Sequence, residues 1–144
     1  MSNPVAVSET LDLYSSVQRF YADQMHLLDA GATTEWAATF TENGVFAADG
    51  HPHPAVGRSN IAAAAQSTVD KLVAAGRRHR HWLGMLTVRA DGDSVSATSY
   101  ALVIDVPRNG DPTIHRSTVC HDVLVPAGDT WLVSDRKVTR DDLA

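Results

Sequence analysis

The spacing of the hydrophobic residues changes near residue 78, and this change constrains the fold more than any other feature of the sequence. Before it, apolar residues recur at three- and four-residue spacings, which is typical of amphipathic helices. From His79 onward, long segments rich in Val, Thr, Leu and Trp are separated by short turn signals. Helices gathered before four consecutive strands predict an α+β fold whose strands form an antiparallel meander.

Three helices and one short strand are predicted in the first half of the chain. Glycines follow the first and third apolar stripes and mark helix ends, and Ser59 is the predicted cap of the third helix. Residues 49–58 contain Pro52 and Pro54 and are predicted to be loop. The predicted elements are helices at 11–30, at 33–40 and between Ser59 and Gly76, and a strand at 45–48.

Four long strands are predicted in the second half. The turns between them are marked by Asp91-Gly92, Asn109-Gly110 and Ala127-Gly128-Asp129. Three helices on one face of a strongly curved, mostly antiparallel sheet would form a cone-shaped barrel with an interior. We therefore expect a single domain at 11–144, preceded by a flexible tail at 1–10. The predicted strands lie at about 79–90, 93–106, 113–125 and 130–139.

Composition and charge exclude several classes of function. The chain has 12 Lys and Arg against 17 Asp and Glu, and this net charge of −5 argues against nucleic acid as a partner. No apolar run approaches the roughly 20 residues that span a bilayer, so no membrane partner is expected. The single cysteine and the lack of a basic, apolar leader favour the cytoplasm. Because glycine-rich nucleotide fingerprints are also missing, we expect no cofactor.

Asp29 and His81 are the candidate acid–base residues. Asp29 falls in the last turn of the first predicted helix, where the helix dipole disfavours a carboxylate by roughly 0.3–1 kcal/mol. It continues the face that carries Tyr21 and Met25, so it is either a solvated acid at a helix end or a general base facing an apolar space. His81 is either a proton-transfer group, since an imidazole exchanges protons near neutrality, or a buried histidine bonded to the backbone.

Two His-x-His patterns, at 51–53 and 79–81, raise the question of a metal site. The first lies in the proline-containing loop, where we expect exposed or lid residues. The second places two histidines on one face of a predicted strand. A site of this type would need a glutamate a few residues later, and residues 54–65 and 82–90 contain none. We therefore expect no metal.

Six short motifs lie along the chain in a characteristic order. They are Phe20-Tyr21-x7-Asp29, Trp36-x3-Phe40-Thr41-Glu42-Asn43-Gly44-Val45-Phe46, Val56-Gly57-Arg58-x2-Ile61, Arg78-His79-x-His81-x2-Gly84, Ala97-x2-Tyr100 and Trp131-Leu132-Val133-x2-Arg136-Lys137-Val138. Their order and spacing over about residues 11–140 resemble the SnoaL-like branch of the nuclear transport factor 2-like superfamily. This branch includes scytalone dehydratase, bile-acid dehydratase and polyketide cyclases, which are small cofactor-independent enzymes.

The resemblance implies a site formed by Asp29, His81 and Asp105, in which the aspartate at the end of the first helix faces the histidine of the first long strand. Taken on its own, Asp105 is instead a strand-end residue before the turn at 106–107. Hydrophobic and small polar side chains would line the substrate pocket around this site. The residues expected to line it are Tyr14, Tyr21, Met25, Phe46, His79, Val103, Thr118 and Cys120.

The function that the resemblance implies is dehydration, isomerisation or cyclisation of a hydrophobic polyketide- or steroid-like substrate without a cofactor. The alternative is a non-catalytic ligand-binding protein, or a structural partner like the small subunit of ring-hydroxylating dioxygenases. The predicted strands also carry apolar residues on both faces, with Val103 on one side, for instance, and Leu102 and Leu124 on the other. Because exposed apolar patches mark interfaces, and the family commonly dimerises, we expect a homodimer.

Overall fold

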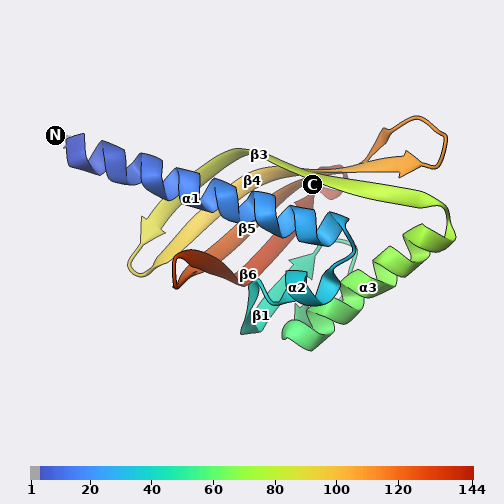
Figure 1. Ribbon diagram of the computed structural model, residues 1–144, viewed down its shortest axis with the longest axis horizontal. Helices are drawn as coiled ribbons and strands as arrows, with labels where there is room; N and C mark the ends of the chain where they lie inside the picture. Colours follow the sequence, from blue (N-terminus) through green and yellow to red (C-terminus); the bar gives the residue numbers. More distant parts are fainter. Residues whose placement is uncertain (1–3) are drawn as a thin grey trace.

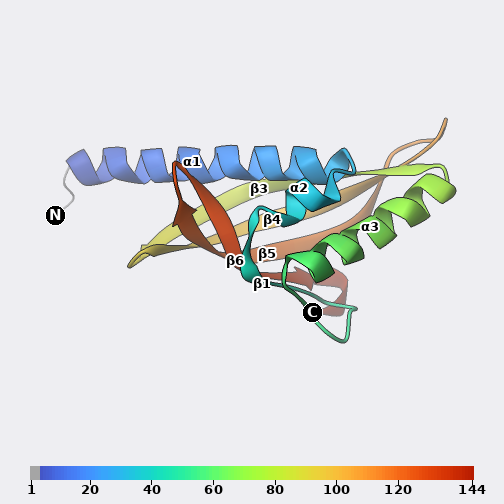
Figure 2. The same ribbon diagram turned by 60° about the horizontal axis from the view of Figure 1, so that its bottom comes forward.

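Three helices cover one face of a six-stranded sheet in the computed structural model, which describes residues 4–144, with side chains from Glu9 onward (Figure 1). In the turned view the sheet curves beneath the helices, and the helices lie together on one side of it (Figure 2). This arrangement confirms the predicted α+β cone. In chain order the elements are α1 (Pro4–Asp29), α2 (Thr33–Ala37), β1 (Phe40–Ala48), β2 (Ala55–Val56), α3 (Arg58–Ala74), β3 (Arg77–Asp91), β4 (Ser94–Pro107), β5 (Thr113–Ala127), β6 (Thr130–Arg140) and the 3-10 helix η1 (Asp141–Leu143).

The four long strands pair as an antiparallel meander, as their turn signals predicted. The strand order of the sheet is β2-β1-β6-β5-β4-β3. Within the described chain, β1 and β6 are the two neighbouring strands that run parallel. Gly92 and Asn109 take φ values of 59° and 60° in two of the hairpin turns, a conformation that these residue types tolerate best. The turn chemistry therefore fixes where each strand of the meander ends.

The first helix begins earlier than the sequence pattern indicated, at Pro4 instead of residue 11. Proline suits the first position of a helix because its fixed φ is helical and its missing N–H would have no partner there. The expected flexible tail at 1–10 is therefore helical from residue 4, and residues 1–3 lie outside the described part of the chain. Although α1 has 26 residues, no helix of the described chain is long and apolar enough to cross a membrane.

The second helix is shorter, and the first strand longer, than predicted. α2 ends at Ala37 instead of residue 40, because Phe40 pairs with Val133 of β6 and so begins β1. The strand predicted at 45–48 is the final part of β1. A pairing with a strand more than ninety residues away leaves no local signal, so the sequence pattern could not reveal this boundary.

The predicted loop at 49–58 contains a short strand and the first residue of a helix. β2 pairs antiparallel with the end of β1, and α3 begins at Arg58. Ser59 is not the cap of α3: Gly57 occupies that position with a φ of 86°, which favours glycine, and no side chain caps the helix. A glycine with a positive φ therefore precedes the first turn of α3, where a serine hydroxyl cap was expected.

The hydrophobic core lies between the helices and the concave face of the sheet. Val17 and Phe20 of α1 are buried against Leu124 and Val133 of the sheet. Leu124 therefore faces the core, and its assignment to the side opposite Val103 was wrong. The pairing of Leu124 with Val95 puts both side chains on the inner face. Burial of each large apolar side chain stabilises the fold by about 1.5–3 kcal/mol.

Candidate functional site

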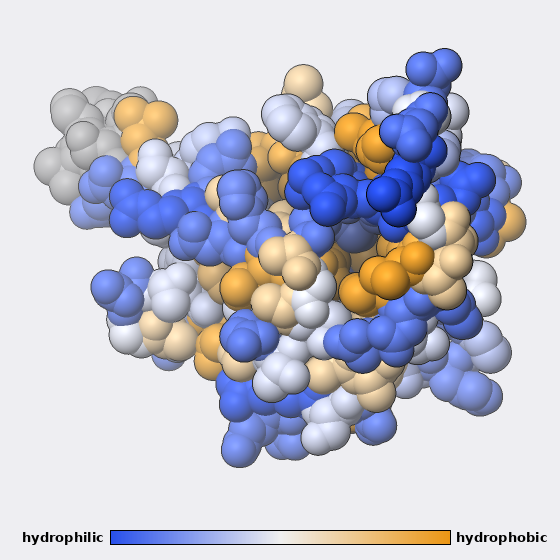
Figure 3. Space-filling view, turned by 45° about the vertical axis from the view of Figure 1, so that its right-hand side comes forward, coloured by the Kyte–Doolittle hydropathy of each residue, from blue (hydrophilic) through white to orange (hydrophobic). Residues whose placement is uncertain are grey.

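A cavity of about 780 Å³ lies between the helices and the concave face of the sheet. This volume falls in the range of about 300–1,000 Å³ that is usual for small-molecule sites. On the face shown in Figure 3, apolar and hydrophilic residues surround a hollow in the surface. Exposed residues mark the entrance of the cavity: His51, Val73, Arg77, Arg78 and His115. Buried residues form its floor: Met25, Trp36, Ile61, Cys120 and Arg136.

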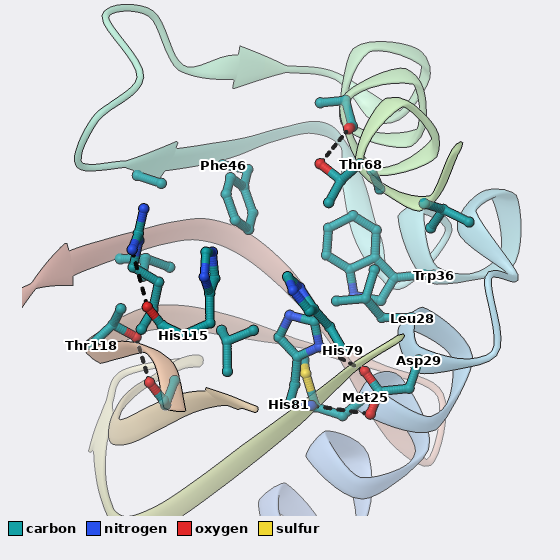
Figure 4. A pocket seen from close by; sticks show the side chains of 18 of the residues that line it. Met25, Leu28, Asp29, Trp36, Phe46, Thr68, His79, His81, His115 and Thr118 are labelled. Carbon is teal, nitrogen blue, oxygen red and sulfur yellow. Dashed lines mark hydrogen bonds and ion pairs between the residues drawn. The ribbon is translucent and has the colours of Figure 1, made fainter. Parts of the chain in front are cut away.

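Asp29 and His81 meet in the wall of this cavity (Figure 4). Oδ1 of Asp29 lies 2.6 Å from Nδ1 of His81, and Oδ2 accepts the backbone N–H of the same histidine at 3.1 Å. The last residue of α1 is thereby held against β3. These two bonds offset the unfavourable position of a carboxylate at a helix C-terminus. The side chain of His81 remains 26% exposed, so the imidazole is accessible from the cavity.

The carboxylate of Asp29 fixes the orientation of the imidazole. An ionised carboxylate only accepts hydrogen bonds, so Nδ1 of His81 carries the hydrogen and Nε2 keeps its lone pair. Among the side chains that the structure describes, none bonds Nε2. His81 can therefore take a proton from a bound molecule and later return it, while Asp29 stabilises the imidazolium that forms between the two steps.

Asp105 does not join this pair. It is buried on β4, where it forms an ion pair with Arg77 of the neighbouring strand, and Nε2 of His79 lies 3.2 Å from its Oδ1. The antiparallel register explains this arrangement, because Asp105 lies opposite His79 and not opposite His81. Asp105 also does not line the cavity. The expected set of three residues is therefore divided into two separate Asp–His pairs.

His79 forms the second of these pairs and also lines the cavity. Its ring centroid lies 5.0 Å from that of His115 on β5. Burial lowers the pKa of His79, and the neighbouring His115 lowers it further, against the opposing effect of Asp105. His79 is thus a neutral imidazole at neutral pH, and it can hydrogen-bond a ligand without carrying a charge.

A buried ion pair that the sequence pattern did not reveal borders the cavity. Arg136 donates to both carboxylate oxygens of Asp122, from Nε at 2.9 Å and from Nη2 at 2.8 Å. Nη2 also bonds Gln24, and the hydroxyl of Tyr21 donates to Asp122 at 2.6 Å. Burial acts to lower the pKa of the guanidinium, but Asp122 outweighs it and raises that pKa above its ordinary value. Arg136 is therefore a fixed positive charge in the cavity floor.

Most of the residues expected to line the pocket do so. Tyr14 and Tyr21 are the exceptions: Tyr14 is 36% exposed, and Tyr21 is buried against Asp122. Burial and Asp122 raise the pKa of Tyr21, so its hydroxyl stays protonated and committed to that carboxylate. The expected residues that line the cavity are Met25, Phe46, His79, Val103, Thr118 and Cys120.

Cys120 contributes a thiol to the cavity floor, and not a thiolate. It is 2% exposed, and its sulfur donates to Asp122 at 3.3 Å. Burial raises the pKa of Cys120 to about 12, so it is not a nucleophile at neutral pH. Within residues 9–144, no group of three or more His, Cys, Asp or Glu side chains could hold a metal ion. The imidazoles of His79 and His81 and the carboxylate of Asp29 line the same cavity.

Comparisons with known proteins agree with this fold. Residues 9–137 match the family model of the SnoaL-like domain. The structure of ActVI-ORFA from Streptomyces coelicolor is 35% identical with a TM-score of 0.84, covering 91% of this chain and 98% of that chain. The structure of Aln2 from another Streptomyces species is 30% identical with a TM-score of 0.84, covering 99% of this chain and 96% of that chain.

A third solved structure is that of a complex. It is a protein from Catenulispora acidiphila in complex with S-DNPA, 34% identical with a TM-score of 0.83, covering 92% of this chain and 96% of that chain. No curated protein matched this chain significantly. The likeness to these solved structures extends over nearly the whole length of both chains.

Proposed function

Because this chain belongs to the SnoaL-like domain family, we propose that it is a cofactor-independent enzyme that transfers protons on a hydrophobic, oxygenated small molecule. The observation that carries this proposal is the hydrogen-bonded Asp29–His81 pair in the wall of a cavity of small-molecule size. Dehydration, isomerisation and cyclisation each require a proton to be removed next to a carbonyl group and a proton to be returned elsewhere. One imidazole held by a carboxylate can perform both steps.

In the proposed reaction His81 acts first as a base. Its Nε2 takes a proton from the carbon next to the substrate carbonyl, the electrons of the C–H bond form an enolate, and Asp29 stabilises the imidazolium. The imidazolium then gives its proton to one of three acceptors: a departing hydroxyl, which leaves as water; the γ-carbon, where the enolate is a conjugated dienolate; or the alkoxide that forms when the enolate carbon bonds to a second carbonyl carbon and closes a ring. Each route returns His81 to its starting state and needs no further reactant.

A polyketide-like ring system is the substrate class that we propose. The cavity wall consists largely of aliphatic and aromatic side chains, which favour an apolar skeleton: Met25, Leu28, Trp36, Phe46, Ile61, Leu72, Leu83 and Val103. The C. acidiphila structure in complex with S-DNPA supports a small-molecule ligand. S-DNPA is therefore the first compound to test for binding to this chain.

Asp105 enters the proposal as a positioning residue. It holds His79 in the cavity wall two residues before His81 on the same face of β3. A change at Asp105 is therefore expected to weaken substrate binding more than it slows proton transfer.

Hydrogen–deuterium exchange beside the carbonyl of 1-tetralone in D2O, followed by proton NMR, tests the proposed chemistry. This bicyclic ketone reports proton removal without requiring the natural substrate. The wild-type protein is expected to accelerate the exchange, and His81→Gln and Asp29→Asn are expected to slow it by about 10²–10⁴-fold, the usual contribution of general acid–base catalysis. His26→Gln, an exposed change in the same helix, is the matched control.

Equal exchange in the wild type and in His81→Gln would contradict the proposal. Binding of S-DNPA without any exchange would instead favour the alternative, a non-catalytic binding protein.

We also propose a homodimer formed through the outer face of the sheet. Trp82, Tyr100 and Ile114 are 65%, 58% and 64% exposed. Their neighbours His81 and Ala101 line the cavity, so Trp82 and Tyr100 point to the opposite face of β3 and β4. A second copy would remove these side chains from water, and the two cavities would remain independent.

A further inference from the structure

The indole nitrogen of Trp36 is a buried hydrogen-bond donor without a partner. Trp36 is 4% exposed, and within the described chain no atom accepts a hydrogen bond from Nε1. This nitrogen can only donate. A buried donor that loses water and gains no partner costs about 1–3 kcal/mol, and such groups are rare in folded proteins. The indole nitrogen therefore invites an acceptor that binds in the cavity.

The rest of the indole is engaged in packing, which fixes the direction of the nitrogen. The ring meets Phe40 nearly edge-on, with centroids 5.1 Å apart and planes at 72°, and meets Phe46 at 6.0 Å and 66°. Trp36 also lines the cavity that contains the Asp29–His81 pair. In Figure 4 the edge of the ring that carries the nitrogen is turned toward the side where the labelled histidines lie.

We propose that Trp36 donates its indole N–H to an oxygen atom of the bound substrate. The inference rests on the proposed function only in taking the cavity as the substrate site. The chemistry of the group sets the class of ligand: an apolar skeleton with an acceptor oxygen, such as a ketone, lactone or ether. Trp36 is thus a specificity-determining residue, because a site that hydrogen-bonds an oxygen discriminates against an analogue that lacks it.

Indole NMR signals test this directly with two probes of the same shape. The chain has three tryptophans, so its ¹⁵N–¹H spectrum has three indole signals, which Trp→Phe variants assign. Nε1 of Trp131 already bonds Ser16, and Trp82 is exposed, so both serve as internal references. 1-Tetralone, which has a carbonyl oxygen, is expected to move the Trp36 proton downfield. Tetralin, the hydrocarbon with the same ring skeleton, is expected not to.

Affinities provide the second measurement. Trp36→Phe is expected to weaken 1-tetralone binding by roughly 2- to 12-fold, the equivalent of one net hydrogen bond, and to leave tetralin binding unchanged. Trp131→Phe, which removes an indole outside the cavity, is the matched control and is expected to leave both affinities unchanged.

Three results would overturn the inference. They are equal downfield shifts with both probes, equal weakening of both probes in Trp36→Phe, and no binding of 1-tetralone to the wild type. If Trp36→Phe fails to fold, the wild-type spectra with the two probes decide alone. His81→Gln separates this inference from the proposed function, because it is expected to slow deuterium exchange by about 10²–10⁴-fold while the Trp36 signal still moves with 1-tetralone.

Discussion

Asp122→Asn is expected to destabilise the protein by about 3–5 kcal/mol, because it removes one charge of a buried ion pair and leaves the other without compensation. Asp122 and Arg136 have side chains that are 0% and 3% exposed, so water cannot replace the lost charge. The carboxylate accepts two bonds from Arg136, one from Tyr21 and one from the Cys120 thiol, and among the residues that the structure describes Asp122 is the ion-pair partner of the guanidinium. This loss is a large share of the roughly 5–15 kcal/mol that keeps a typical domain folded.

Urea unfolding followed by far-UV circular dichroism measures this change. For a slope of about 2 kcal/mol per molar urea, the midpoint is expected to fall by roughly 1.5–2.5 M. Wild type and variants are compared at one chain concentration, because a dimer gains stability by mass action. Asp135→Asn, an exposed change on β6, is the matched control and is expected to stay within about 0.5 kcal/mol of the wild type. A loss below about 1 kcal/mol in Asp122→Asn would refute the reasoning.

A double variant separates the ion pair from its packing. Asp122→Leu combined with Arg136→Met removes both charges, so no buried charge is left unpaired, and it is expected to be more stable than Asp122→Asn alone. If the double variant were instead destabilised by the sum of its single changes, the two side chains would not be coupled.

Four further outcomes are expected. Iodoacetamide alkylates Cys120 slowly in the folded protein and rapidly in urea, since burial raises the pKa of the thiol to about 12; equal rates would contradict this. An NMR titration is expected to give His79 a pKa below its ordinary value of about 6.5. As the pH falls below about 6.5, the unfolded chain therefore takes up this proton before the folded chain does, and the free energy of unfolding decreases. His115→Gln raises the pKa of His79, and an unchanged pKa would show that the second ring has no effect. Size-exclusion chromatography with light scattering gives twice the chain mass of 15.5 kDa for the wild type and a single chain for Trp82→Glu, whereas a wild-type monomer would contradict the proposed interface.

The overall fold was predictable because its signals are local. The turns at Asp91-Gly92 and Asn109-Gly110 separate strands whose side chains suit a sheet, and the apolar stripe of the first helix ends before Gly31. The elements that were missed depend on distant partners. β2 forms only because β1 lies beside it, and the residue that begins β1 is set by its pairing with β6.

The candidate site likewise contains residues that local sequence signals locate and contacts that depend on distant strand pairing. Asp29 could be located from its position at a helix end, and His81 from its place on a strand face. The partner of Asp105, by contrast, depends on the register between β3 and β4, which a single sequence does not fix. The opposition of Asp122 and Arg136 likewise follows from the register of β5 and β6.

The central claim is that Asp29 acts on the substrate through His81, and a double-mutant cycle on the 1-tetralone exchange rate tests it most directly. Exchange is measured for the wild type, Asp29→Asn, His81→Gln and the double variant. Residues that act as one unit give strongly non-additive effects, so the double variant is expected to be no slower than His81→Gln alone, because a carboxylate without its imidazole has nothing to orient. A double variant slowed by the product of the two single effects would show independent action and would contradict the account.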